Sequence, residues 1–124
     1  MLIAAASLAL LACTACFSEH VTAQASGVDA RAVCADPTTA GPDVVVIRNF
    51  AFQPATVRVA AGQQVTWVNC EIGGVPHSSS SDAAGWDSGL LDRFATFSRT
   101  FAAAGTFAYH CSVHPSMKAS VIVQ

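Results

Sequence analysis

Short apolar or alternating runs, separated by turn residues, follow one another from residue 43 to the end of the chain. They are Val44–Arg48, Thr56–Ala60, Gln64–Cys70, a stretch after His77, Ala95–Phe101, Thr106–Cys111 and Lys118–Val123. Glycine and proline fall between the runs, and no convincing helical period accompanies them. The pattern predicts an all-β domain, a Greek-key β-sandwich or barrel of about seven to eight strands.

Strand periodicity assigns side chains to faces, because alternate residues of a strand point to opposite sides of the sheet. Phe107, Tyr109 and Cys111 share one face, and His110 lies on the other. If the aromatic pair faces the core, Cys111 emerges on the core side at the end of its strand. Met117 shares a parity with the apolar residues at 119, 121 and 123, which predicts that it lies at the mouth of the same core.

The N-terminal part of the sequence is typical of an exported protein. Its apolar run at 2–12 is too short to span a membrane and has the length of a secretory signal core. We expect a signal peptide at 1–25, a flexible leader at 26–42 and one domain at 43–124. The end of the run also resembles a bacterial lipobox, so lipidation of Cys13 and simple cleavage after Ala23 or Ala25 are alternatives. Both place the protein in the periplasm or on the outer cell surface.

Charge excludes some partners. Six Lys and Arg stand against eight Asp and Glu, which gives a formal charge of -2. The sequence therefore has no basic footprint for nucleic acid or for an anionic membrane, and any membrane contact would run through a lipid anchor.

One loop between predicted strands combines Cys111, His114 and Met117 in a Cys-x2-His-x2-Met spacing. Thiolate, imidazole and a weak thioether suit a soft ion that cycles between Cu(I) and Cu(II). A trigonal copper site with a long axial Met needs one further imidazole. Other readings are a cysteine nucleophile, for which no orienting third residue or substrate cleft is evident, and structural zinc, which has no use for a thioether.

Three histidines are candidates for the missing imidazole. His20 lies in the predicted signal peptide, and His110 has the wrong strand parity to meet Cys111. His77 follows the predicted strand that ends at Cys70, so it is the predicted partner.

These residues resemble the plastocyanin, amicyanin and pseudoazurin branch of the cupredoxins over residues 43–124. The matching stretches are 49–56, 61–69, Pro76-His77, 86–90 and 105–111, followed by a Cys-to-Met loop of amicyanin-like length. The resemblance implies one type 1 copper ion with His77, Cys111 and His114 as equatorial ligands and Met117 as the axial ligand. Ser78 stands where plastocyanins have an Asn that ties the ligand loops together, and we expect it to do the same more weakly.

The resemblance also implies a function. Such a protein transfers single electrons between redox partners that dock near His114, binds no small-molecule substrate and is not an enzyme. Two alternatives remain from the sequence: a copper carrier or storage protein that delivers the ion itself, and a metal-free interaction module that would leave the Cys, His and Met cluster unexplained.

Two cysteines remain once Cys111 and the signal-peptide cysteines, Cys13 and Cys16, are set aside. They are Cys34 and Cys70, and in an exported protein they predict a disulfide. This bond would join the N-terminal leader to the strand end that precedes His77.

Overall fold

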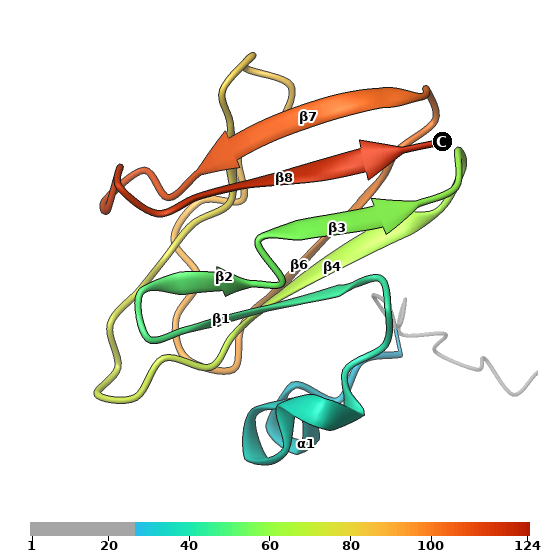
Figure 1. The fold of residues 1–124 in the computed structure, drawn as a ribbon. Helices are drawn as coiled ribbons and strands as arrows, with labels where there is room; N and C mark the ends of the chain where they lie inside the picture. The colour runs from blue at the N-terminus through green and yellow to red at the C-terminus, as the bar shows by residue number, and fades with distance from the viewer. Residues whose placement is uncertain (1–26) are drawn as a thin grey trace, which may run out of the picture.

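The computed structural model describes residues 27–124, which form a two-layered β-sandwich with one short helix against it (Figure 1). The helical elements are α1 (Ala30–Ala35) and the 3-10 turn η1 (Pro37–Thr39). The strands are β1 (Val44–Arg48), β2 (Ala51–Gln53), β3 (Thr56–Val59), β4 (Gln64–Asn69), β5 (Ser80–Ser81), β6 (Thr96–Thr100), β7 (Gly105–His110) and β8 (Lys118–Val123).

Each layer is a sheet of four strands. One has the order β2-β1-β4-β6 and the other β3-β8-β7-β5. Each sheet contains one parallel pair, β1 with β4 and β3 with β8, whose strands are far apart in the sequence. The predicted all-β sandwich is therefore confirmed, and its long-range pairings hold the loops after β4 and β7 at one end of the molecule.

The core lies between the two sheets and is rich in aromatic rings. Side chains of alternate residues enter it, as the strand pattern predicts: Val45 and Ile47 from β1, and Val65 and Trp67 from β4. Tyr109 is fully buried and packs edge-on against Trp67, with ring centroids 5.4 Å apart. Burial of these large apolar side chains is the main force that holds the layers together.

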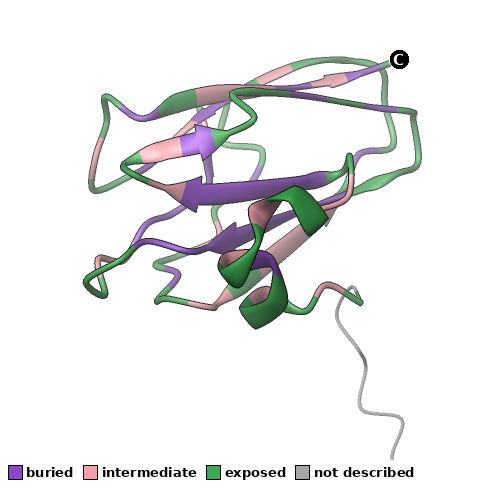
Figure 2. Ribbon diagram, turned by 60° about the horizontal axis from the view of Figure 1, so that its bottom comes forward, coloured by how far each residue is buried: buried purple, intermediate pink, exposed green. Residues whose placement is uncertain are grey.

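Helix α1 covers the outer face of the β1 and β4 pair. Val33 of α1 packs there against Val44, Val46 and Val68, which have the opposite strand parity from the core residues. Figure 2 shows α1 largely exposed, lying against the buried strands of this sheet. The prediction of a leader without packed elements at 26–42 is wrong for this part, because α1 is too short to give a periodic signal and is stabilised by tertiary contacts.

The disulfide between Cys34 and Cys70 is present, with Cα atoms 5.1 Å apart, so this prediction is confirmed. It attaches α1 to the residue that follows β4. The N-terminal cap of α1 is Asp29, whose carboxylate accepts the backbone N–H groups of Arg31 and Ala32.

Seven of the strands fall on the predicted runs, and β2 is the one that the sequence pattern missed. It holds only three residues and ends next to Pro54, which leaves too few positions for a visible alternation. None of the helical elements in residues 27–124 has the length and hydropathy of a membrane span. The predicted signal peptide and Cys13 lie outside the described residues.

Candidate metal centre

Two loops at one end of the sandwich carry the predicted ligands. Cys111 directly follows β7, and the turn after it bears His114 and Met117 before β8 begins. His77 comes from the loop between β4 and β5. His77 and Cys111 are fully buried, whereas His114 is partly exposed, so the cluster lies just below the surface.

The donor atoms of His77, Cys111 and His114 converge. Nδ1 of each imidazole lies 3.7 Å from Sγ of Cys111, and the three donor atoms all lie within 4.8 Å of one another. Trigonal bonds of about 2.1 Å to nitrogen and 2.3 Å to sulfur, lengths typical of a first-row metal such as zinc, would separate those donors by about 3.8 Å. The spacing therefore fits one metal ion, and the thiolate and imidazole set favours copper.

Met117 closes the loop on the core side. Its backbone N–H donates to the carbonyl of His114 at 2.9 Å, and its own carbonyl accepts the N–H of Cys111 at 3.1 Å. The side chain is buried in the same core cluster as Cys111, as its parity predicts. The axial role of its thioether remains a prediction.

Ser78 joins the two ligand loops. Its hydroxyl accepts the backbone N–H of Ser112 at 2.8 Å and donates to the Ser112 hydroxyl at 2.8 Å. Its own backbone N–H points at Sγ of Cys111, 3.3 Å away. The residues next to His77 and Cys111 are therefore bonded to each other directly.

Glu71 holds the far side of the His77 ring. Its carboxylate lies 3.1 Å from Nε2 of His77 and also accepts the backbone N–H groups of Asn49 and Phe50, at 3.2 and 2.8 Å. When Nε2–H donates to this carboxylate, the lone pair of Nδ1 is free to face the cluster, as a metal ligand requires.

The charge states of His77 and Glu71 follow from burial and hydrogen bonding. Burial lowers the pKa of His77, since the imidazolium would lose its hydration, although the carboxylate of Glu71 acts in the opposite direction. Burial alone would raise the pKa of Glu71. The hydrogen bonds from Phe50, His77 and Asn49 outweigh that effect and hold the pKa of Glu71 below its ordinary value. A neutral imidazole beside a carboxylate is the resulting state.

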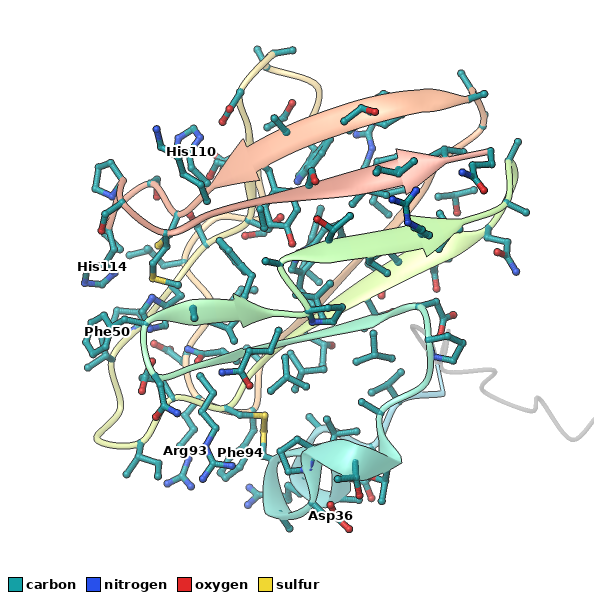
Figure 3. All side chains as sticks on the ribbon, viewed as in Figure 1. Asp36, Phe50, Arg93, Phe94, His110 and His114 are labelled. Atoms are coloured by element: carbon teal, nitrogen blue, oxygen red, sulfur yellow. A yellow bond between two sulfur atoms is a disulfide. The ribbon has the colours of Figure 1, made fainter. Side chains whose placement is uncertain are left out.

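Phe50 shields both histidines from solvent. Its ring stands edge-on to His77 and His114, with centroids 5.3 and 5.1 Å away, while the side chain itself stays 52% exposed. Figure 3 shows Phe50 next to His114. Asn49 and Phe50 form the two-residue β1–β2 turn, and both have a φ of 54°. Such a φ is costly for a bulky residue. The two N–H groups that Glu71 accepts hold this turn in place.

Sequence reasoning missed Glu71 and Phe50 as site residues. The available signals were an acidic residue at the end of a buried strand and a large aromatic residue in a turn. The exclusion of His110 is supported by the structure, since its ring faces away from the cluster and contacts Asp82, 2.5 Å from Nδ1 to Oδ1.

The sequence profile of the copper-binding proteins of the plastocyanin/azurin family matches residues 43–124. The chain belongs to this family. It is therefore a cupredoxin, with copper as its cofactor, and an electron carrier rather than an enzyme.

Relatives of this cupredoxin include two amicyanins. Amicyanin of Paracoccus denitrificans is 31% identical over 127 residues, which cover 98% of this chain and 92% of the relative. Amicyanin-alpha of Methylorubrum extorquens is 33% identical over 123 residues, with 95% and 98% covered.

Solved structures resemble the fold of this cupredoxin. The Cu(I) form of an amicyanin variant has a TM-score of 0.60 and 30% identity, and the match covers 65% of this chain and 80% of that one. A purple cupredoxin from Nitrosopumilus maritimus has a TM-score of 0.59 and 26% identity, with 65% and 98% covered.

Proposed function

We propose that this cupredoxin holds one copper ion between Nδ1 of His77, Sγ of Cys111 and Nδ1 of His114, with the thioether of Met117 as a weak fourth ligand. The observation that carries the proposal is the convergence of three donor atoms within 4.8 Å from two separate loops. Copper bound there supplies a single-electron couple between Cu(I) and Cu(II).

The contribution of the chain is to keep its donor atoms in place while the charge changes. Ser78 bonds one ligand loop to the other, and Glu71 fixes the orientation of the His77 ring. The ligand residues His77 and Cys111 are fully buried, so the side chains packed around them restrict their movement. Little movement between oxidation states keeps the reorganisation cost of electron transfer small, which favours a carrier of electrons.

Redox partners dock, in this proposal, on the end of the sandwich that exposes His114. The large apolar side chains most exposed in residues 27–124 are Phe50, Ile72, Leu90 and Val113. Ile72 and Val113 lie in the two ligand loops themselves. Phe50 packs against both histidines, and Leu90 precedes Leu91, which pairs with His77. We call these four side chains the apolar face. A set of exposed apolar side chains at one end of a small protein is typical of an interaction site.

The alternative is a copper carrier or storage protein that gives up the ion itself. Burial of Cys111 and His77 favours retention over exchange. Voltammetry of the copper-loaded protein separates the two functions. An electron carrier gives a reversible one-electron wave and keeps its metal against a mild Cu(I) chelator. A colourless Cu(I) form that resists oxidation and loses its metal to the chelator would overturn the electron-carrier proposal and favour the alternative.

We further propose that the protein is exported to the periplasm or outer cell surface, where the Cys34–Cys70 disulfide is stable. In this proposal the signal peptide spans 1–25, residues 43–124 form the copper domain, and lipidation of Cys13 is the route to an anchor. Mass spectrometry of the mature N-terminus tests this. A lipid mass on Cys13 supports the anchor, and an unmodified start at residue 24 or 26 removes it.

A further inference from the structure

Three arginines lie on the flank of the ligand end that is nearest to α1. Arg31 of α1 and Arg93 both stack on the ring of Phe94, with Cζ atoms 4.7 and 4.6 Å from its centroid. Arg48 has the parity of Val44 and Val46, so its side chain leaves β1 on the outer, α1-facing side. We call Arg31, Arg48 and Arg93 the arginine flank.

This flank borders the apolar face. Figure 3 shows Arg93 and Phe94 at the same end of the sandwich as Phe50 and His114. Arg48 precedes Phe50 by two residues, and Arg93 follows Leu90 by three, so two of the arginines share short segments with residues of the apolar face.

No acid within residues 27–124 forms an ion pair with these arginines. The ion pairs within residues 27–124 are His77 with Glu71 and His110 with Asp82, and no arginine or lysine has a carboxylate oxygen within 4.0 Å. The carboxylate of Asp29 is occupied as the cap of α1. Asp92, the exposed neighbour of Arg93 in the sequence, forms no ion pair with it. The guanidinium groups therefore remain open to a partner.

Stacking on Phe94 orients the guanidinium groups of Arg31 and Arg93 before a partner binds. A guanidinium over an aromatic ring keeps its N–H donors in the plane of the group, directed outward, and loses less freedom on binding than an unsupported side chain. Guanidinium donors match the two oxygens of a carboxylate. Phe94 thus presents Arg31 and Arg93 as a pair of carboxylate receptors.

We propose that the arginine flank selects a redox partner whose docking face carries carboxylates beside an apolar centre. This inference rests on the proposed electron-carrier function and names the partner of the same site. Charges at the rim of an interface act mainly on the rate of association and on the choice of partner, and salt screens them. The apolar face would make the main contact with the partner, and the arginine flank would determine which partner binds.

Stopped-flow electron exchange between the copper-loaded protein and two c-type cytochromes, one acidic and one basic, tests the proposal. At low ionic strength the acidic cytochrome reacts faster, and its advantage disappears as salt is added. The double variant Arg31→Gln/Arg93→Gln lowers the low-salt rate with the acidic cytochrome by about tenfold, and it leaves the rate at high salt unchanged. An unaltered visible spectrum of each variant confirms that the copper site is intact.

Arg58→Gln is the matched control for Arg93→Gln. It removes the same charge from an exposed arginine of β3, in a segment paired with the C-terminal part of β8 and away from the ligand loops (Figure 1). Equal rate losses in the two single variants, or a faster reaction with the basic cytochrome, would contradict the proposal that the arginine flank selects the partner. Neither result would contradict the electron-carrier function. Absence of exchange with both cytochromes at low salt would overturn this inference, whereas the electron-carrier function is decided separately by the voltammetry described above.

Discussion

The carboxylate of Glu71 lies 3.1 Å from Nε2 of His77, while Nδ1 of the same ring lies 3.7 Å from Sγ of Cys111. One histidine thus connects a buried acid to the metal donors. The acid also accepts two backbone N–H groups from the turn that carries Phe50. The outer support of the site and the aromatic shield over it therefore depend on one side chain.

Replacing Glu71 with Gln tests that support. The amide has the shape of the carboxylate but not its charge. Its NH2 group cannot accept a hydrogen bond from His77, Asn49 or Phe50. We expect the metal-free protein to lose about 1–3 kcal/mol of unfolding free energy, measured in urea. Copper affinity, measured by competition with a chelator, should fall by about 10- to 100-fold. Affinity unchanged within twofold would contradict a positioning role for Glu71.

Ser78→Ala tests the connection between the ligand loops. It removes the hydroxyl that contacts both the backbone N–H and the side chain of Ser112. A loss of about 1–3 kcal/mol in unfolding free energy is expected, because the fully buried Ser78 loses two hydrogen bonds to Ser112. Ser116→Ala, an exposed position in the Cys-to-Met loop, is the control and should change stability by less than about 0.5 kcal/mol. Similar losses in both variants would argue against a special role for Ser78.

Removing the disulfide with Cys34→Ser/Cys70→Ser should mainly destabilise the fold. The bond closes a loop with a sequence separation of 36 residues. The loop-closure relation gives about 3–4 kcal/mol for a loop of that size. Urea midpoints of the metal-free protein measure the effect, and a loss below about 1 kcal/mol would show that α1 docks without help from the bond.

The stability of the metal-free protein should decrease as the pH falls. The pKa of folded His77 lies below 6.5, so below that pH the unfolded chain takes up a proton that the folded chain excludes. Glu71, with a folded pKa below 4.5, adds a further loss once the pH falls beneath that value. Urea midpoints across this range should drop in both regions. A midpoint that stays constant from neutral pH to the acid side of 4.5 would contradict the assignment.

The sequence predicts most of the fold because strand alternation is readable in runs as long as Gln64–Asn69. The same alternation places Cys111 inside and His110 outside, and the structure agrees. Element α1 is different: six residues provide no helical period, and its position depends on Val33 and the Cys34 bond, which are tertiary contacts. Short elements stabilised by their surroundings are the part that local pattern does not reveal.

The residues of the candidate site also differ in whether the local sequence predicts them. Cys111, His114 and Met117 are close in the sequence, so their spacing is visible, and elimination leaves His77 as the remaining imidazole. The support from Glu71 and the shielding by Phe50 arise from pairing of β1 with β4, which brings residues about 21 positions apart into contact. Nothing in the local sequence around either residue predicts that contact.

The bond between Cys111 and copper is the central claim, and the optical and EPR spectra of the protein loaded with one equivalent of Cu(II) test it most directly. We predict an intense visible thiolate-to-copper absorption and a type 1 EPR signal, both lost in Cys111→Ser while circular dichroism shows the fold retained. The same spectra in both proteins, or no visible absorption in the loaded unaltered protein, would contradict the account.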